Sequence, residues 1–267
     1  MYPDWGLGSF FGANLSSLAI LGDHKVSYIV FIMDSILEGF IKAFYLISNL
    51  DRELIEIIFL SLMVSGMAIL IASAIGVPAG AVIALRRFPG NGFIVSLLNA
   101  FMGLPPVVVG LFLYLLLSRS GPLGFMGLLY TPTAMMMAQT VLAFPIVASL
   151  SHSAIINIDP VIGQTSAALG ATSYQTAVTI LKEARYGIIS AIMAGLGRVM
   201  GEVGAILIVG GNIAGYTRVM TTTIALETDK GNFEIALALG IILLIISLLI
   251  NLLLHVIQRK GVLRTGI

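Results

Sequence analysis

The sequence contains no cysteine and little charge. Without cysteine, the 267-residue chain can form no disulfide bond, thiolate metal site or cysteine nucleophile. Its three histidines are scattered along the chain, which argues against a histidine-based metal cluster. Charged residues make up 10% of the chain, against about 25% in an ordinary soluble domain. So few charges could not cover the surface of a soluble globule of this size, and a soluble enzyme is therefore excluded.

Two further absences concern ligands. The net charge is only +1, because 14 basic residues are balanced by 13 acidic ones. The chain therefore has no basic field with which to bind nucleic acid. No lysine is followed by serine or threonine, so the Gly-x-x-x-x-Gly-Lys-Ser/Thr loop that holds nucleotide phosphates is missing. We expect this chain to bind neither a nucleotide cofactor nor a metal.

Apolar residues dominate what is present. They make up 58% of the chain, and the mean hydropathy is +1.04. A helix that crosses a membrane needs about 20 mostly apolar residues. Five stretches qualify, at about 54–85, 93–117, 128–150, 186–211 and 233–257, and the second is interrupted at residues 103–106, Gly-Leu-Pro-Pro. The sequence thus predicts an all-α polytopic membrane protein with five transmembrane helices in one domain, residues 54–257.

The distribution of lysine and arginine predicts the orientation, since cytoplasmic loops carry more of both. If the carboxyl terminus is cytoplasmic, the cytoplasmic segments hold Arg86, Arg87, Lys182, Arg185, Arg259, Lys260 and Arg264. The opposite side holds Arg52, Arg119, Arg218 and Lys230. Seven basic residues against four place the amino terminus outside and the 258–267 tail in the cytoplasm.

The first fifty residues form two segments. In residues 33–50, Asp34, Glu38 and Lys42 are spaced four apart and share one helical face opposite apolar residues. This pattern favours an amphipathic helix that lies along the membrane surface over a sixth span. Met33 opens the segment, so residues 1–32 are interpreted as an extension that could derive from an upstream start codon.

The polar segment at 152–185 predicts two short helices. Asp159-Pro160 is a helix-start signal, with the carboxylate as N-cap and proline at the first helical position. Gly170 is placed to end a helix over 161–169 in a left-handed conformation. Thr172 or Ser173 can cap the next helix. An ordinary connecting loop is the alternative, although two neighbouring spans could be joined by a shorter one.

This segment resembles the EAA loop of type I ATP-binding-cassette importer permeases. Aligned on Gly170, the Glu-Ala-Ala positions hold Gln164, Thr165 and Ser166, while Ile180 matches the later isoleucine. The glycine and the isoleucine agree with the family, but the acidic residue and the Leu-Pro pair do not. The resemblance implies a coupling helix seated in an ATPase groove. The coupling residues would be Asp159, Pro160, Gln164, Ala168, Gly170, Ile180 and Glu183.

Other segments are similar to oxyanion permeases in particular. Residues 104–110, Leu-Pro-Pro-Val-Val-Val-Gly, look like the proline-centred span of sulfate, molybdate and tungstate permeases. Arg198-x-x-Gly201-Glu202-x-Gly204-Ala205 is similar to the same group. Residues 182–187, 215–222 and 224–231 look like the tungstate branch.

This resemblance implies a tungstate permease of the type I importer fold in a bacterial or archaeal plasma (inner) membrane. It implies a homodimeric pore, two separate ATPase subunits that carry ATP and Mg²⁺, and an extracytoplasmic oxyanion-binding protein. The lipid bilayer surrounds the pore, and no nucleic acid is involved.

The charges predicted deep in the membrane are Arg198 and Glu202. An unpaired charge there costs about 2.5–3.5 kcal/mol, and at a spacing of four the two side chains share one helical face and can pair. Together with Pro105, Pro106 and Gly201 they are candidates for the translocation path or its gate. Guanidinium groups bind tetrahedral oxyanions well, but a structural ion pair is the alternative.

The segment from Gly215 to Gly231 is polar and predicted to face outside. Thr217, Arg218, Glu227 and Lys230 are candidates for an outer vestibule or a docking surface for the binding protein. A solvated loop is the alternative.

Three rival functions remain open at this point. A molybdate or sulfate permease keeps the class and changes the substrate. An ion-coupled secondary transporter also uses broken helices and intramembrane charges, but the long 152–185 segment and the lack of a detectable inverted repeat disfavour it. An intramembrane enzyme would need a nucleophile or a metal, and no histidine lies within a predicted span away from its ends.

Overall fold

The computed structural model describes residues 40–41, 44–45, 52–86 and 88–262, with the backbone alone for 253–262. Every regular element in these residues is a helix and none is a strand, so the all-α prediction is confirmed. The extension 1–32, most of the predicted amphipathic helix 33–50 and the end of the tail lie outside the described residues.

Three helical stretches are long and apolar enough to cross a membrane. They are α2 (Arg52–Leu85), α5 (Pro132–Ile156) and the part Phe233–Leu252 of α11 (Phe233–Val262). Two helix pairs pass the same test together but are bent, namely α3 (Asn91–Phe101) with α4 (Pro106–Leu117) by 100° and α8 (Arg185–Met200) with α9 (Gly204–Gly210) by 60°. By length and composition, the described residues therefore contain three candidate spans, or up to five if each bent pair is one span.

These bends test two of the five predicted spans. The interruption predicted at residues 103–106 is confirmed, because α3 ends at Phe101 and α4 begins at Pro106. The continuous helix predicted over 186–211 is wrong, because α8 ends at Met200 and the chain turns at Gly201 before α9 begins. Gly201 has a φ of −89°, which residues other than glycine also adopt, so the glycine itself does not show the turn.

The predicted third span is shifted along the chain. Thr131 accepts a hydrogen bond from the backbone N of Ala134, and Pro132 occupies the first helical turn, so α5 begins there and not at Leu128. At its other end α5 continues to Ile156, and His152 belongs to this helix instead of the polar segment. Helical hydrogen bonding thus extends the element beyond its apolar stretch.

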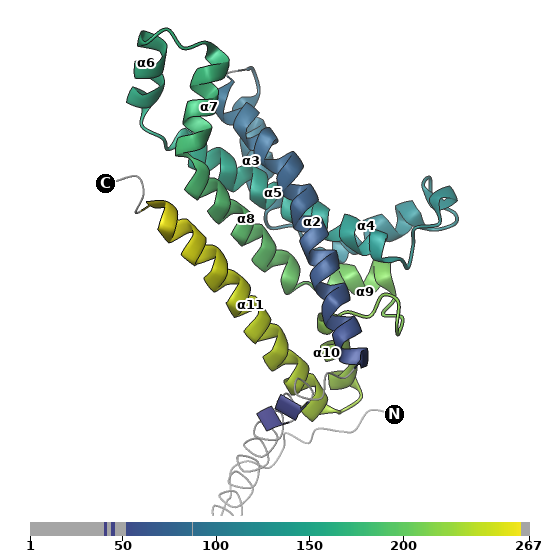
Figure 1. Ribbon diagram of the computed structural model, residues 1–267. Helices are drawn as coiled ribbons and strands as arrows, with labels where there is room; N and C mark the ends of the chain where they lie inside the picture. The colour runs from purple at the N-terminus through teal and green to yellow at the C-terminus, as the bar shows by residue number, and fades with distance from the viewer. Residues whose placement is uncertain (1–39, 42–43, 46–51, 87, 263–267) are drawn as a thin grey trace, which may run out of the picture.

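The centre of the fold is the pair α2 and α5, which lie side by side along most of their length (Figure 1). Their close approach requires a small residue, because a Cβ atom on Gly80 would lie 2.5 Å from the carbonyl oxygen of Ala148. Helix α8 (Arg185–Met200) packs against the same pair, and a Cβ atom on Gly195 would lie 2.8 Å from Cδ1 of Ile69. Gly195 therefore permits α8 to approach α2 closely.

A helical hairpin stands at one end of the molecule, near the end of α2 and the end of α11 (Figure 1). It consists of α6 (Pro160–Ala168) and α7 (Ser173–Glu183). Asp159 caps α6 through the backbone N of Val161 at 2.8 Å, and Gly170 has a φ of +85°. Thr172 forms a capping box with Gln175. The two predicted helices and their turn are confirmed.

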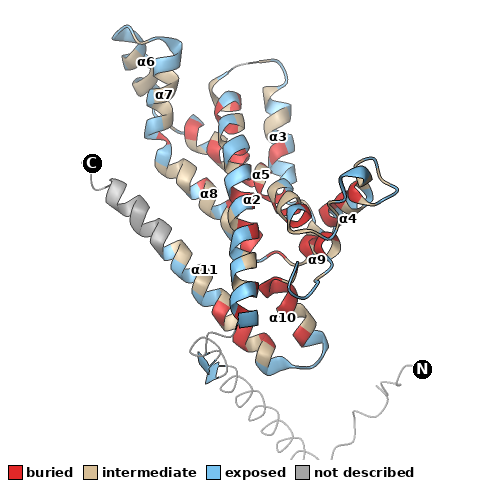
Figure 2. Ribbon diagram, turned by 45° about the vertical axis from the view of Figure 1, so that its right-hand side comes forward, coloured by how far each residue is buried: buried red, intermediate tan, exposed pale blue. Residues whose placement is uncertain are grey.

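The opposite end is closed by α10 (Met220–Asp229), which packs against α11 and the start of α2. On one side of the molecule α4, the 3₁₀ helix η1 (Gly124–Met126) and α9 project away from α11 (Figure 1). Figure 2 shows the buried residues gathered along α5, α9 and α10. A single residue, Ala184, separates α7 from α8, and it is buried against Ile155 and Ala81.

Candidate functional site

The two bent helix pairs meet where α4 packs on α9. A Cβ atom on Gly110 of α4 would lie 2.8 Å from Cα of Ala205, and one on Gly204 would lie 2.9 Å from Cγ2 of Val107. Glycines therefore permit the backbones of the two breaks to approach closely. The two interruptions form one structural unit.

Arg198 joins the two breaks. Its Nη2 donates to the carbonyl oxygen of Leu104 at 3.4 Å, and its Nη1 lies 3.6 Å from Oε2 of Glu202. Leu104 directly precedes Pro105 and Pro106, where the change of helix leaves carbonyl groups without helical donors. The guanidinium group thus satisfies one of the carbonyl oxygens that the proline break frees.

Glu202 is held more firmly than its partner. Its Oε1 accepts a hydrogen bond from the backbone N of Ala205 at 3.0 Å, at the start of α9, where a negative charge is favoured. Its own carbonyl oxygen accepts from Oγ1 of Thr221 at 2.9 Å. The predicted pairing of Arg198 and Glu202 is confirmed. The shared helical face is wrong, because α8 has ended before Glu202.

The two charges differ in exposure. The Arg198 side chain is 34% exposed, whereas the Glu202 side chain is 3% exposed. The arginine is therefore the accessible member, and the carboxylate lies behind it. Gly197 and Gly201 are exposed beside it, and neither would meet a side chain if a Cβ atom were added. Gly195 and Gly204, by contrast, are packed within the chain.

The hairpin presents most of the predicted coupling residues at its surface. Asp159, Pro160, Gln164, Ala168, Gly170 and Glu183 are exposed. Ile180 instead packs into the cluster that joins the hairpin to α2 and α5, 3.6 Å from the position of a Cβ atom on Gly163. The large apolar residues that the hairpin exposes, Val161, Leu169 and Tyr174, are not among the predicted residues.

Two of the residues predicted for the outer surface are buried. Thr217 is fully buried and donates from Oγ1 to the carbonyl oxygen of Gly210 at 2.6 Å. Glu227 is buried and accepts hydrogen bonds from Lys230 at 2.8 Å and from Asn232 at 2.7 Å. Arg218 lies 3.9 Å from Glu53 at the start of α2. In this chain, then, Thr217 and Glu227 face inward, while Lys230 is exposed.

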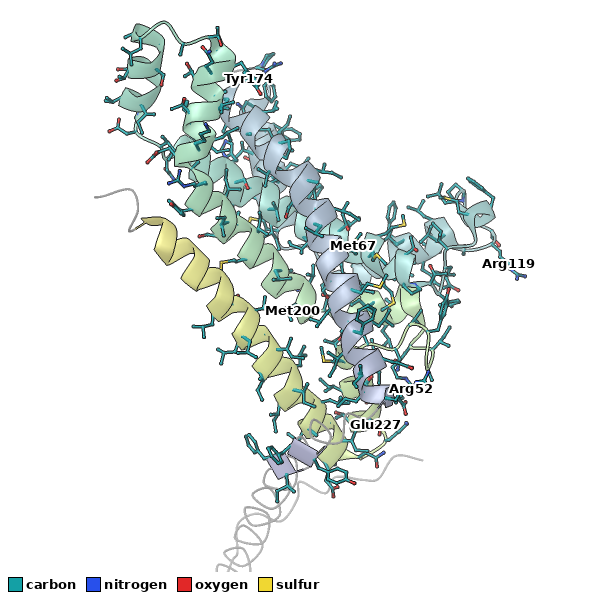
Figure 3. All side chains as sticks on the ribbon, in the orientation of Figure 1. Arg52, Met67, Arg119, Tyr174, Met200 and Glu227 are labelled. Atoms are coloured by element: carbon teal, nitrogen blue, oxygen red, sulfur yellow. The ribbon has the colours of Figure 1, made fainter. Side chains whose placement is uncertain are left out.

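The hydrogen bonds to Glu227 also affect its charge. The bond from Lys230, followed by that from Asn232, lowers the pKa of this carboxyl group below its ordinary value. The ionised group joins the end of α10 to the turn before α11. Tyr174 on the hairpin and Glu227 on α10 mark the two ends of the molecule in Figure 3.

Sequence reasoning did not identify Gln139, a fully buried polar residue on α5. Its Nε2 donates to the carbonyl oxygen of Val199, near the end of α8, at 2.9 Å. The available signal was a single amide between the apolar residues of an otherwise apolar stretch. No group of three or more acidic or histidine side chains that could hold a metal occurs in the part of the chain that the structure describes.

Comparison of the sequence with known proteins finds a matching family and several relatives. The family model described as "Binding-protein-dependent transport system inner membrane component" matches residues 76–261. A tungstate uptake system permease protein, TupB of Peptoclostridium acidaminophilum, is 40% identical over 85% of this chain and 100% of its own length. A probable anion ABC transporter permease protein of Haloferax volcanii is 44% identical over 72% of this chain and 84% of its own length.

Less similar relatives and solved structures complete the comparison. Molybdenum and sulfate transport permeases are 23% to 30% identical. A chain of the MetNI methionine ABC transporter has a TM-score of 0.66 at 19% identity, covering 79% of this chain and 97% of that chain. A chain of a bacterial alginate ABC transporter has a TM-score of 0.66 at 20% identity, covering 92% and 94%. These structures share the fold.

Proposed function

Because this chain belongs to the family of binding-protein-dependent transport system inner membrane components, we propose that it is the permease subunit of an ATP-driven tungstate importer. It is a multi-pass membrane protein with the fold of ABC importer permeases and relatives that transport oxyanions. We propose tungstate as the substrate because a relative named for tungstate uptake is 40% identical to this chain over that relative's whole length. The relatives named for molybdenum and sulfate share less.

The observation that carries this proposal is the unequal exposure of Arg198 and Glu202. An approaching dianion would meet the guanidinium group, whose planar set of donors suits a tetrahedral oxyanion. The buried carboxylate behind it offsets much of the positive charge. A pore must release its substrate as well as admit it, and a compensated arginine attracts an anion without holding it.

The homodimer is part of the proposal. Ser190, Ala194, Gly197 and Gly201 are all exposed on α8 or at its end. They recur at about helical spacing and leave a face of small residues beside Arg198. A second copy facing this surface would enclose a path between the two subunits, with one compensated arginine on each side.

ATP hydrolysis belongs to separate chains in this scheme, with ATP and Mg²⁺ bound by two ATPase subunits. The hairpin would seat α6 in each ATPase through its exposed apolar residues Val161 and Leu169. Asp159 and Glu183 are also exposed there, and either could supply the acidic contact that Gln164 cannot. An extracytoplasmic oxyanion-binding protein would deliver the substrate at the α10 end, with the amino terminus outside and the carboxyl terminus in the cytoplasm.

The test is uptake by the reconstituted complex. The permease is purified with its ATPase and binding protein, incorporated into proteoliposomes and supplied with tungstate and molybdate side by side. We expect tungsten accumulation that requires ATP and the binding protein and that exceeds molybdenum accumulation. Preferential uptake of molybdenum would instead support the alternative that this chain is a molybdate permease. Uptake driven by an ion gradient without the ATPase would support a secondary transporter and overturn the proposal.

A further inference from the structure

Gln139 of α5 holds the end of α8 by a hydrogen bond. The side chain extends from α5, is 1% exposed, and donates through Nε2 to the carbonyl oxygen of Val199 at 2.9 Å and towards Oγ of Ser65 at 3.3 Å. The same carbonyl oxygen of Val199 also accepts from the backbone N–H of Gly201 and, at 3.3 Å, from the backbone N of Glu202. The bond from the Gln139 amide is shorter than the bond from Glu202 at the point where α8 ends.

This contact lies next to the candidate site formed by Arg198 and Glu202. Val199 directly follows Arg198, and the turn at Gly201 places Glu202 three residues later. The carbonyl oxygen of Glu202 is held in turn by Thr221 of α10. The two carbonyl groups that flank the turn are thus each held by a side chain from another helix. These two contacts lie on either side of the turn that joins Arg198 to Glu202.

A small pocket adjoins the amide. It is lined by Ser61 and Ser65 of α2, by Gln139, by Met200 of α8 and by Thr221. Oε1 of Gln139 is buried and has no hydrogen-bond partner. An apolar side chain of similar size would leave no acceptor unsatisfied. Packing alone therefore does not account for an amide at this position, whereas the bond to Val199 does.

We propose that Gln139 is a positioning residue for transport, which holds the end of α8 so that Arg198 stays at the path with Glu202 behind it. The inference rests on the proposed function, because it assigns the turn at Gly201 to the translocation path. It requires no contact between Gln139 and the anion. Its effect would pass through the carbonyl group of Val199.

The first test removes the donor. Gln139→Leu keeps the volume of the side chain approximately and loses the bond to Val199. ATP-driven tungstate uptake is measured in proteoliposomes beside the yield of the assembled complex. We expect the maximal uptake rate to fall at least tenfold while the complex still assembles and hydrolyses ATP. The reason is that the substitution displaces the Arg198–Glu202 pair but does not alter the ATPase subunits.

The second test makes the donor depend on pH. In Gln139→Glu, the carboxyl group can donate to the carbonyl oxygen of Val199 only when it is protonated. Uptake by this variant should fall reversibly as the pH is raised, relative to wild-type protein at the same pH. None of the residues that line the pocket is ionisable, and the charged groups at the turn, Arg198 and Glu202, are present in both proteins. If Gln139 had a purely structural role, the pH profiles of uptake by Gln139→Glu and by wild-type protein would be parallel.

Thr140→Val is the matched control. Thr140 follows Gln139 on α5, but its Oγ1 donates to the carbonyl oxygen of Met136 in its own helix at 2.7 Å and to that of Ala68 in α2 at 3.4 Å, neither of which belongs to α8. This variant should transport like wild-type protein at every pH. Normal uptake by Gln139→Leu would overturn the inference, and so would failure of both Gln139 variants to assemble. Absence of tungstate uptake in the wild-type protein would instead refute the proposed function.

Discussion

The guanidinium group of Arg198 donates to the carbonyl oxygen of Leu104, a residue 94 positions earlier in the chain. One end of this contact lies at the proline break between α3 and α4 and the other lies at the end of α8. Neither break is a local irregularity, because each supplies a group that the other needs. A substitution at one break should therefore also alter the structure of the other break.

Glu202→Gln is expected to block tungstate uptake without preventing assembly. Glutamine keeps an acceptor oxygen for the backbone N of Ala205 but leaves the charge of Arg198 without compensation. The anion would then be held too tightly, and we expect uptake to fall about tenfold or more, equal to ~1.4 kcal/mol or more in the barrier. Uptake and complex yield are measured together. Normal uptake by this variant would refute a role for the carboxylate charge.

Gly80→Ala should destabilise the protein, and Gly66→Ala should not. Both residues lie in α2, but a Cβ atom on Gly80 would lie 2.5 Å from the carbonyl oxygen of Ala148, while one on Gly66 meets nothing within 4 Å. Overpacking costs about 1–3 kcal/mol, whereas alanine in a helix is favoured over glycine by about 1 kcal/mol. Thermal unfolding in detergent is the measurement. Equal melting temperatures for the two variants would contradict the close packing of α2 on α5.

Leu169→Ser should weaken the association with the ATPase. Leu169 is 84% exposed at the end of α6, where an exposed leucine contributes nothing to packing within this chain. Phe125→Ser is the matched control, since Phe125 is equally exposed but belongs to η1, which follows α4 on the side of the molecule away from the hairpin (Figure 1). Copurification of the ATPase is measured for both variants. Loss of the ATPase from both, or from neither, would speak against α6 as the docking element.

Acid should weaken the corner between α10 and α11. The pKa of Glu227 is lowered in the folded protein by its bonds to Lys230 and Asn232. This carboxylate therefore contributes stability that is present above the ordinary pKa of about 4.3 and is lost as the pH falls through the lower folded value. The difference in melting temperature between wild-type protein and Glu227→Gln should shrink on acidification. The exposed Asp229→Asn serves as control and should show no such convergence.

Local signals in the sequence predicted local structure well. Asp159, Pro160 and Gly170 determine where α6 begins and ends through contacts within a few residues, so the hairpin could be derived without its surroundings. The interruption at Pro105 was likewise visible, because proline lacks the donor that a helix needs. The amphipathic helix at 33–50 stays a prediction.

The turn at Gly201 could not be derived in the same way. The residues around it read as a continuing apolar helix, and the stabilising contacts come from Thr221, Gln139 and Leu104, far away in the sequence. Thr217 and Glu227 were misjudged as surface residues for a related reason. Polarity does not distinguish a solvated side chain from one whose partners are supplied by the fold.

The single residue between α7 and α8 has a mechanical consequence. Ala184 is 2% exposed and packs in one cluster with Ala81 of α2 and Ile155 of α5, so no flexible linker separates the hairpin from α8. The 16 residues of α8 span roughly 24 Å. A tilt of about 10° at Ala184 would move the far end of that helix by roughly 4 Å, more than the distance that now joins Arg198 to Leu104. A tilt of this size would therefore separate Arg198 from Leu104 and uncouple the two breaks.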